Sequence, residues 1–202
     1  MGDINKIAVL YGGSSSEREI SIQSGEGVYK AIIELGFVAD LIDINDLEDL
    51  SELKVFDFIF IALHGFEGEG GKLQKDLDDL NILYSGSSSK CCKNTWNKKL
   101  TKEILEQNNI NTPIWSEVNK LPSYDSPNAK LSDSFFDKFR PFEAIFLKPQ
   151  EDGSSIDIFK ISNDNNNKNA IQACLNPNRA FIYEEYINGK EFTVTIIDNI
   201  CL

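Results

Sequence analysis

Short apolar runs and helical apolar repeats alternate along the first half of the chain. Residues 7–10 form an apolar run that ends at a Gly-Gly pair, which is typical of a buried strand entering a turn. Apolar residues over positions 20–35 then recur at helical spacing, and Gly36 stands where a left-handed C-terminal cap is expected. Ser16 and Glu19 fit a capping box at the start of this helix. The pattern predicts a strand, a glycine turn and a long helix.

The same alternation continues to about residue 107. Residues 58–63 mix aromatic and β-branched side chains, which favours a central parallel strand that is buried on both faces. A Gly-rich stretch then leads into a short helix that carries Leu73, Leu77 and Leu80. Further strands are expected at residues 38–44 and 82–84, and a further helix at residues 97–107. This alternation indicates an open, mostly parallel α/β sheet, with ligands at the carboxyl ends of the strands.

The character of the chain changes beyond that helix. Residues 117–141 are rich in Ser, Pro, Asp and Asn without a clear period, so we expect a loop with a weak helix near residues 135–139. A mixed α+β unit follows, with strands expected at 144–147, 156–161, 181–186 and 192–197, a polar turn at 164–168 and a short helix at 169–175. The chain stops at Leu202, directly after the last strand. We interpret this ending as a truncation; a C-terminal edge strand is the alternative.

Composition narrows the class of protein. The chain has 202 residues, of which 41% are hydrophobic and 26% charged, an ordinary globular balance. Its apolar runs are far shorter than the ~20 residues of a membrane span, and its start lacks the pattern of a secretory signal. We therefore expect a cytoplasmic protein without a membrane segment. The net charge of −12 argues against nucleic acid as a partner, and any bound polyanion must be held by a few placed lysines and backbone amides.

Two loops at expected strand ends carry candidate site residues. Glu17 follows the Gly-Gly pair at the start of the first helix, where glycines allow close approach and free backbone N–H groups attract a ligand. The alternative is that Glu17 and Glu19 only complement the helix dipole. His64 is the single histidine of the chain; it ends a buried strand and precedes a Gly-rich loop. It is either a site residue or a structural histidine.

Two later loops carry a lysine and a group of carboxylates. Lys148 ends an apolar strand and is followed by Ser154 and Ser155. A partly desolvated lysine is costly without an anion, so this loop indicates a phosphate clamp; an ordinary turn with a snorkelling lysine is the alternative. Glu184 and Glu191 lie near the end of another expected strand. They either accept hydrogen bonds from an amine or a sugar, or form a solvated edge.

These four loops, in this order, resemble the signatures of the D-alanine–D-alanine ligases of the ATP-grasp superfamily. The matching segments are residues 9–21 (VLYGGSSSEREIS), 62–65 (ALHG) with Gly68, Glu69 and Gly71, 146–149 (FLKP) with Gly153, Ser154 and Ser155, and 184–189 (EEYING) with 191–194 (EFTV). The resemblance covers essentially the whole chain. It implies a Rossmann-like, pre-ATP-grasp domain at residues 1–90, the first α+β lobe of an ATP-grasp fold at 91–187, and the start of a truncated second lobe at 188–202.

The resemblance also implies a reaction. ATP phosphorylates the carboxylate of one D-alanine, the amine of a second D-alanine attacks the acyl phosphate, and phosphate leaves to give D-alanyl-D-alanine for peptidoglycan. Such a reaction depends on positioning and charge stabilisation rather than on a protein nucleophile. The implied partners are D-alanine and ATP, and the family commonly forms homodimers.

Roles follow from motif position. Glu17 would bind the ammonium of the first D-alanine beside His64, and Ser154 would link Glu17 to the loop that closes the site. The expected nucleotide contacts are Lys98 and Lys148 at the phosphates, Ser154 and Ser155 in the covering loop, Glu184 at the adenine amine with Glu185 beside it, Tyr186 and Ile187 along the adenine, and Glu191 at the ribose.

The chain departs from the family in sequence and in length. Gly70 stands where Asp is usual, Trp96-Asn97 replaces Met-Asp before Lys98, and Asp157 replaces a glycine. Asp157 would weaken ATP binding if it pointed inward. The family's Mg²⁺ ligands lie beyond Leu202, so the chain by itself is expected not to catalyse ligation. Two other functions stay open: an ATP-grasp ligase with another acceptor such as D-lactate, and a non-catalytic remnant that serves as a binding module.

Overall fold

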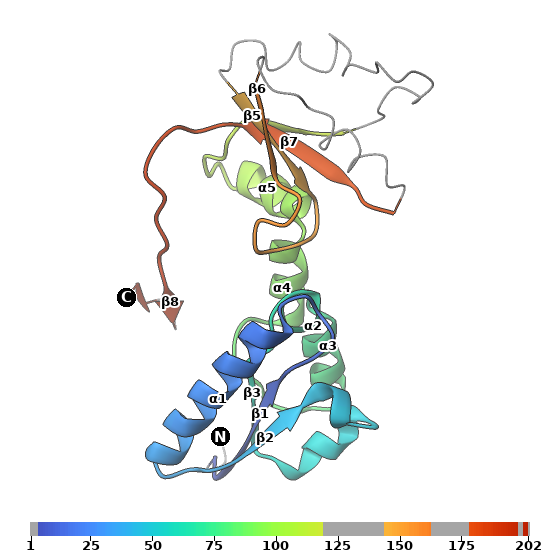
Figure 1. Ribbon diagram of the computed structural model, residues 1–202, viewed down its shortest axis with the longest axis vertical. Helices are drawn as coiled ribbons and strands as arrows, with labels where there is room; N and C mark the ends of the chain where they lie inside the picture. Colours follow the sequence, from blue (N-terminus) through green and yellow to red (C-terminus); the bar gives the residue numbers. More distant parts are fainter. Residues whose placement is uncertain (1–3, 119–143, 163–177, 198–199, 202) are drawn as a thin grey trace. The chain divides into compact units, whose positions relative to one another are not determined.

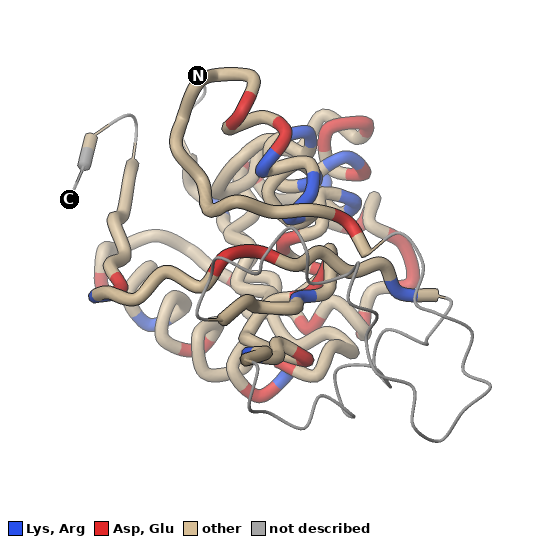
Figure 2. The backbone as a smooth tube through the Cα atoms, turned by 90° about the horizontal axis from the view of Figure 1, so that it is seen from above, with Lys and Arg blue, Asp and Glu red and all other residues tan. Residues whose placement is uncertain are grey.

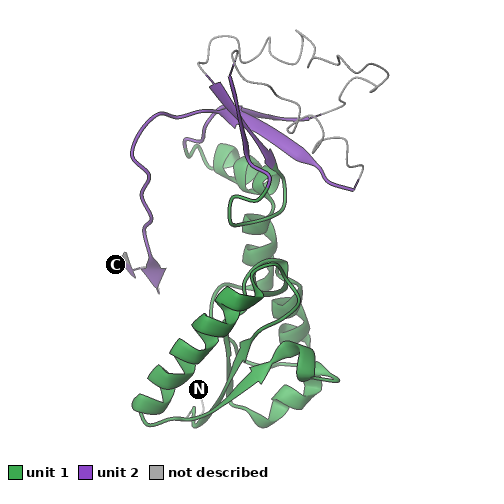
Figure 3. Ribbon diagram, viewed as in Figure 1, with its two compact units in different colours: residues 1–110, 149–156 green, residues 111–148, 157–202 purple. Residues whose placement is uncertain are grey.

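The computed structural model describes residues 4–118, 144–162, 178–197 and 200–201 (Figure 1). The chain divides into two compact units, residues 1–110 with 149–156 and residues 111–148 with 157–202 (Figure 3). The expected weak helix near 135–139, the turn at 164–168 and the helix at 169–175 lie outside the described residues. The three-part division at residues 90 and 187 stays a prediction.

A parallel sheet organises the first unit. Its strands stand in the order β2 (Val38–Asp43), β1 (Lys6–Tyr11) and β3 (Phe58–Ile61), and β1 pairs in parallel with both neighbours. The expected fourth strand is reduced to an isolated parallel bridge between Ile59 and Tyr84. The bridge still covers the second side of β3, because Ile59 N donates to Leu83 O at 2.8 Å. The predicted parallel α/β sheet is confirmed.

Helices bury both faces of this sheet. One core lies against α1 (Arg18–Glu34) and contains Ile7, Val9, Ile32, Ala39 and Ala62. The other lies against α3 (Lys72–Asp79) and contains Ala8, Leu10, Leu53, Ile59, Leu63, Leu73, Leu77 and Ile82. Successive residues of a strand point to opposite faces, so β1 supplies both cores and is buried throughout residues 7–10. Strand β3 covers only residues 58–61 of the expected strand, but it contributes to both cores as predicted: Ile59 and Ile61 pack in the core beside α3, while Phe58 and Phe60 pack against the core beside α1.

The two ends of α1 differ in how well the sequence predicts them. Gly36 has a φ of 87° and its N–H donates to Ile33 O at 2.9 Å, which confirms the left-handed cap. The predicted capping box at Ser16 is wrong: the N-cap is Glu17, whose side chain makes no capping hydrogen bond. The preceding serines point to another loop instead, since Ser15 Oγ donates to His64 O at 3.1 Å and Ser14 donates to Glu67. These tertiary contacts fix where the helix starts.

Shorter helices complete the first unit. They are the 3₁₀ turns η1 (Ile44–Asp46) and η2 (Leu50–Val55) and the helices α2 (Phe66–Glu69), α4 (Ser89–Trp96) and α5 (Lys98–Gln107). The predicted helix at residues 97–107 is confirmed, with Asn97 as N-cap accepting from Leu100 N at 3.1 Å. Helix α4 was not expected because it buries no residue fully and therefore shows little apolar period.

Asp78 ties α3 to the bridge strand and to α4. Its carboxylate accepts hydrogen bonds from Tyr84 Oη and Ser89 Oγ, each at 2.9 Å. Burial, followed by the contact with Asp78, raises the pKa of Tyr84 to about 12. A phenol of raised pKa stabilises the fold fully below its unfolded pKa of 10.0, and this stabilisation is lost as pH rises toward 12.

The variant Tyr84→Phe is therefore expected to lower the free energy of unfolding by about 1 kcal/mol at pH 8. The difference from the parent chain should shrink above pH 10. Urea unfolding at pH 8, 9, 10 and 11 measures this directly. A difference that stays constant, or that grows with pH, would contradict the assignment.

The second unit is built on a four-stranded sheet. The strands stand in the order β4 (Trp115–Glu117), β7 (Phe181–Glu185), β5 (Ala144–Pro149) and β6 (Phe159–Ser162). The pairs β4–β7 and β5–β6 are antiparallel. The short strands β8 (Ile196–Ile197) and β9 (Ile200–Cys201) form a separate antiparallel pair. The mixed α/β class with one parallel and one antiparallel sheet agrees with the prediction.

Two strand predictions in the second unit need correction. The strand expected at 156–161 begins only at Phe159, because residues 154–157 form turns. The strand expected at 192–197 is wrong over 192–195, where the chain is irregular and Phe192 is 82% exposed. An apolar alternation forms a strand only where a neighbour accepts its hydrogen bonds.

Among the described residues, the helices are too short or too polar to cross a membrane.

Candidate functional site

A glycine turn connects β1 to α1 and is locked by one carboxylate. Asp43 accepts from Gly13 N at 3.2 Å and forms an ion pair with Arg18 at 2.6 Å. Arg18 also donates to Gly13 O at 2.8 Å. Burial acts to raise the pKa of Asp43, but the hydrogen bonds from Arg18 and from two backbone amides outweigh it, so the pKa lies below its usual value.

Gly12 in this turn has no space for a side chain. Its φ is +79°, and an added Cβ would lie 2.3 Å from Asp43 Oδ2. We expect Gly12→Ala to lower the free energy of unfolding by about 2–3 kcal/mol. The control is Gly27→Ala in α1, where an added Cβ meets nothing within 4 Å and helix propensity improves by up to ~1 kcal/mol. Similar losses in both variants, measured by urea unfolding, would rule out the lock.

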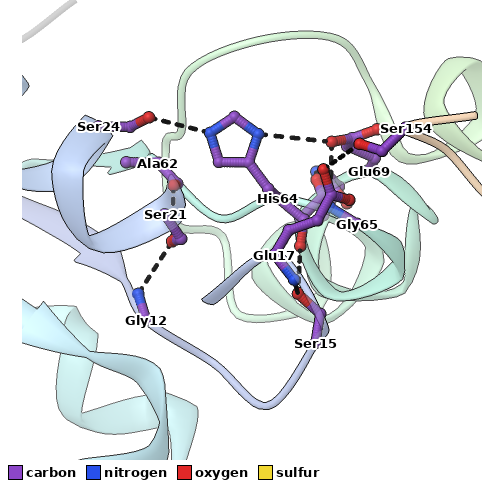
Figure 4. A network of polar contacts seen from close by, with 12 residues as sticks. Gly12, Ser15, Glu17, Ser21, Ser24, Ala62, His64, Gly65, Glu69 and Ser154 are labelled. Carbon is purple, nitrogen blue, oxygen red and sulfur yellow. Dashed lines mark hydrogen bonds and ion pairs between the residues drawn. The ribbon is translucent and has the colours of Figure 1, made fainter. Parts of the chain in front are cut away.

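A polar cluster at the sheet's carboxyl end holds His64 (Figure 4). Its Nε2 lies 3.0 Å from Ser24 Oγ, and its Nδ1 lies 3.9 Å from Glu69 Oε1. Glu69 also accepts from Gly65 N at 3.1 Å. The imidazole side chain is 34% exposed, so it is fixed on two sides but remains open to solvent.

Glu17 and Ser154 meet in the same cluster. Ser154 Oγ donates to Glu17 Oε1 across a separation of 137 residues (Figure 4). Ser15 fixes the backbone of Glu17, because its Oγ accepts from Glu17 N at 3.2 Å. Ser21 is fully buried below the turn and donates to Ala62 O at 2.8 Å. The structure thus brings together three predicted residues, Glu17, His64 and Ser154, in one unit.

The loop after β5 is docked on the start of α5. Lys98 N donates to Gln150 O at 2.7 Å, and the Lys98 ammonium donates to Asp152 O at 2.6 Å. Ser154 and Ser155 have φ values of 49° and 59°, a region that non-glycine residues seldom adopt. Lys98 therefore holds the loop that carries both serines. Its contact with ATP phosphates stays a prediction.

The second unit carries its own cluster around Lys148. The Lys148 ammonium donates to Glu184 on β7, and the two side chains are 22% and 9% exposed. The ammonium also lies 5.1 Å from the centre of the Phe146 ring, which meets Tyr186 edge-on with the centroids 5.5 Å apart. Lys160 Nζ lies 3.5 Å above the Tyr186 ring. Aromatic faces and a buried carboxylate suit a flat base with an amino group.

The remaining predicted residues lie along the chain after β7. Glu185 pairs with the loop before β4, since its N–H donates to Ile114 O at 2.8 Å. Ile187 is 59% exposed, and Glu191 is exposed as well. Their proposed nucleotide contacts stay predictions.

Asp157 is neutralised within its own unit. Its carboxylate accepts a hydrogen bond from Arg179, which lies beside the Phe181 ring. An acidic side chain held by an arginine presents less negative charge to a nearby phosphate. The carboxylate of Asp157, where the family has glycine, is therefore paired with a basic side chain.

Acidic positions otherwise recur along the elements of both units (Figure 2).

Several site residues were not found from the sequence. Ser21 and Ser24 stand three residues apart in α1; Ser21 donates to Ala62 O, and Ser24 Oγ lies 3.0 Å from His64 Nε2. Their helical spacing was a usable signal, because residues three apart share a helix face. Lys160 and Arg179 had no such signal, since their partners Tyr186 and Asp157 are 22 to 26 residues away in the chain.

Comparison with known proteins agrees with this architecture. Residues 104–201 match the family described as D-ala D-ala ligase C-terminus. The chain is 34% identical to a D-alanine–D-alanine ligase of Bordetella avium, covering 95% of this chain and 58% of that protein. It is 36% identical to D-alanine–D-alanine ligase A of Clostridium perfringens, covering 96% and 62%. The chain thus spans about three fifths of the length of these curated relatives.

Solved structures give the same result. The D-alanine–D-alanine ligase of Bacillus anthracis complexed with ATP is 28% identical with a TM-score of 0.75, covering 92% of this chain and 60% of that one. D-alanyl-alanine synthetase A of Vibrio cholerae has a TM-score of 0.80 at 22% identity, covering 98% and 66%, and supports the fold alone. The fold is that of the ATP-grasp proteins. Within that class, the chain is similar to the D-alanine–D-alanine ligases over about three fifths of their length.

Proposed function

We propose that this chain is part of an ATP-dependent ligase that joins two D-alanines through an acyl phosphate. The observation that carries the proposal is the hydrogen bond from Ser154 to Glu17. It joins the loop after β5 to the start of α1, so the loop expected near the phosphates reaches the residue expected to hold the amino acid. A reaction between these two ligands needs this proximity.

Residues of the first unit would bind the amino acid. Glu17 offers a carboxylate to the ammonium of the first D-alanine, and a charge-assisted hydrogen bond of this kind is among the stronger ones. His64, oriented by Ser24 and Glu69, lies beside it and limits the space around the substrate. Ser154 closes the site from the loop.

Residues of the second unit would bind the nucleotide. Lys148 directs an ammonium at the phosphates of ATP, while Glu184 accepts from the adenine amine. An ammonium has three donors and a carboxylate about four acceptor positions, so the pair can bind each other and the nucleotide together. Tyr186 and Ile187 cover the base, and Glu191 accepts from the ribose hydroxyls. Lys98 and Ser155 complete the phosphate contacts.

Magnesium requires separate treatment. ATP-dependent phosphoryl transfer uses Mg²⁺ to neutralise the phosphates. Within residues 4–118, 144–162, 178–197 and 200–201, the His, Cys, Asp and Glu side chains form no group of three that could hold a metal. We therefore assign no residue of this chain to Mg²⁺ and derive no step from it. The cytoplasm as location and a homodimer as assembly remain part of the proposal, on the family resemblance alone.

The test is D-alanine-dependent release of ADP by the protein as its gene encodes it. We expect release only when ATP and D-alanine are both present, and D-alanyl-D-alanine as product. A second reaction with D-alanine and D-lactate separates the acceptors: a depsipeptide in place of the dipeptide would assign the D-lactate type. Calorimetry with ATP covers the non-catalytic alternative, and no heat of binding together with no ADP release would refute the ligase.

A further inference from the structure

An aromatic pair supports the loop that carries Ser154. Trp96 ends α4, and its ring centroid lies 6.1 Å from that of Phe66 in α2, with the planes tilted by 59°. Trp96 also reaches the loop itself, because a Cβ built on Gly153 would lie 3.8 Å from Trp96 Cζ3. Gly153 directly precedes Ser154. The indole thus lies next to the loop, so that a methyl group at position 153 would touch it one residue before the serine that binds Glu17.

Gly70 makes room for this pair. It follows α2, and a Cβ built on it would lie 2.6 Å from Phe66 Cδ2 and 2.7 Å from Phe66 Cε2. The ring therefore occupies the space of any side chain at position 70. The backbone at Gly70 has an ordinary φ of −75°, so the glycine is required by space: the Phe66 ring and the Phe66 carbonyl oxygen, which also lies 2.6 Å from the added Cβ, both occupy the position of a side chain. Gly70 and Trp96, two of the family departures, contact the same Phe66 ring.

The loop depends on support from outside. Asp152, Ser154 and Ser155 all have positive φ, at 121°, 49° and 59°. Non-glycine residues keep such conformations only where their surroundings fix them. Asn97 and Lys98 fix the first half of the loop, through Glu151 and the Gln150 and Asp152 carbonyls. In the second half of the loop, Ser154 donates to Glu17, Ile156 N donates to Gly153 O, and Trp96 lies beside Gly153.

We propose that Phe66 and Trp96 form an aromatic brace that positions Ser154 against Glu17 and thereby sets the affinity for the first amino acid. They are positioning residues, because neither touches a reacting group. The role in substrate affinity rests on the proposed ligase function. The support that the aromatic pair gives to the loop does not rest on the proposed function, because it concerns contacts within the first unit only.

The test uses two variants that disturb the Phe66–Trp96 pair, one acting on each aromatic residue. Trp96→Ala removes the indole. Gly70→Ala places a methyl group against the Phe66 ring and the Phe66 carbonyl oxygen, without changing either aromatic residue or the loop. Trp96→Phe keeps a ring in place and is the conservative rescue. Phe37→Leu is the matched control, because Phe37 is an aromatic residue 40% exposed and directly beyond α1.

Hydrogen exchange of the 202-residue chain is the first readout. Two amides report on the loop: Ile156 N, which donates to Gly153 O at 3.1 Å, and Lys98 N, which donates to Gln150 O at 2.7 Å. We expect exchange at both to rise about threefold to tenfold in Trp96→Ala and Gly70→Ala. Trp96→Phe should stay within about twofold of the parent, and Phe37→Leu should not differ from it. Unchanged exchange in both brace variants would overturn the proposal.

Steady-state kinetics of the ligase form the second readout. The KM for the first D-alanine should rise by a similar factor in both brace variants, while the KM for ATP stays within about twofold. Loosened exchange with an unchanged KM for D-alanine would overturn the positioning role. Hydrogen exchange is measured without substrate, so it does not depend on catalysis. A parent enzyme that releases no ADP would refute the proposed function. The exchange result would still show whether the aromatic brace supports the loop.

Discussion

The variant Glu17→Gln is expected to raise the KM for the first D-alanine about tenfold to a hundredfold. Glutamine keeps the shape and can still accept from Ser154, but it loses the charge that would pair with the substrate ammonium. A hydrogen bond to a charged group contributes about 1.5–3 kcal/mol, and each 1.4 kcal/mol is tenfold in affinity. The KM for ATP should stay within about twofold, because Glu17 has no proposed contact with the nucleotide.

Glu19→Gln provides the matched control. Glu19 lies in the first turn of the same helix and is exposed, so the variant makes the same change of charge beside the site without touching it. We expect both KM values to match the parent. Initial rates measured against each substrate in turn decide the matter. If Glu17→Gln raised both KM values equally, or if Glu19→Gln produced the same effect, the ammonium role would be wrong.

The sequence predicted the fold best where the local pattern and the tertiary structure agree. The strand at residues 7–10 is apolar at every position, and it is buried on both faces as β1. The helix end at Gly36 follows from a single residue that tolerates a positive φ. In both cases the cause lies within a few residues, so it can be read without knowing the neighbours.

The errors share one physical origin, which is competition from distant groups. Ser16 has the right type for an N-cap, but Ser15 and Ser14 bind His64 O and Glu67 some 50 residues away and shift the helix start to Arg18. Residues 192–195 alternate like a strand but have no described ladder partner. Local preference is a weak prior wherever such contacts exist.

The candidate site shows the same division. Glu17, His64 and Ser154 were found from glycine-rich loops at strand ends, and the structure brings them together. The residues that hold them were not found, because a positioning contact such as Lys98 to Asp152 O leaves no local pattern. Sequence reasoning finds groups that carry unusual chemistry at loop ends. It misses ordinary groups whose importance comes only from their neighbours.

Lys148→Met is expected to have two large effects that can be measured separately. The KM for ATP should rise about tenfold to a hundredfold through loss of a charged hydrogen bond, while the KM for D-alanine changes little. The free energy of unfolding should also fall by about 3 kcal/mol, because Glu184 is left as a buried carboxylate without its lysine. Lys75→Met is the control, since the Lys75–Asp79 pair is exposed on both sides and should contribute less than about 1 kcal/mol.

A double variant separates the structural role of Lys148 from its role in binding. Adding Glu184→Gln to Lys148→Met removes the negative charge that has lost its lysine and should recover most of the lost free energy of unfolding. It should not recover ATP affinity, because methionine at position 148 cannot donate to the phosphates. If the double variant regained both stability and the parent KM for ATP, Lys148 would be only the structural partner of Glu184. The phosphate contact would then have to come from another residue.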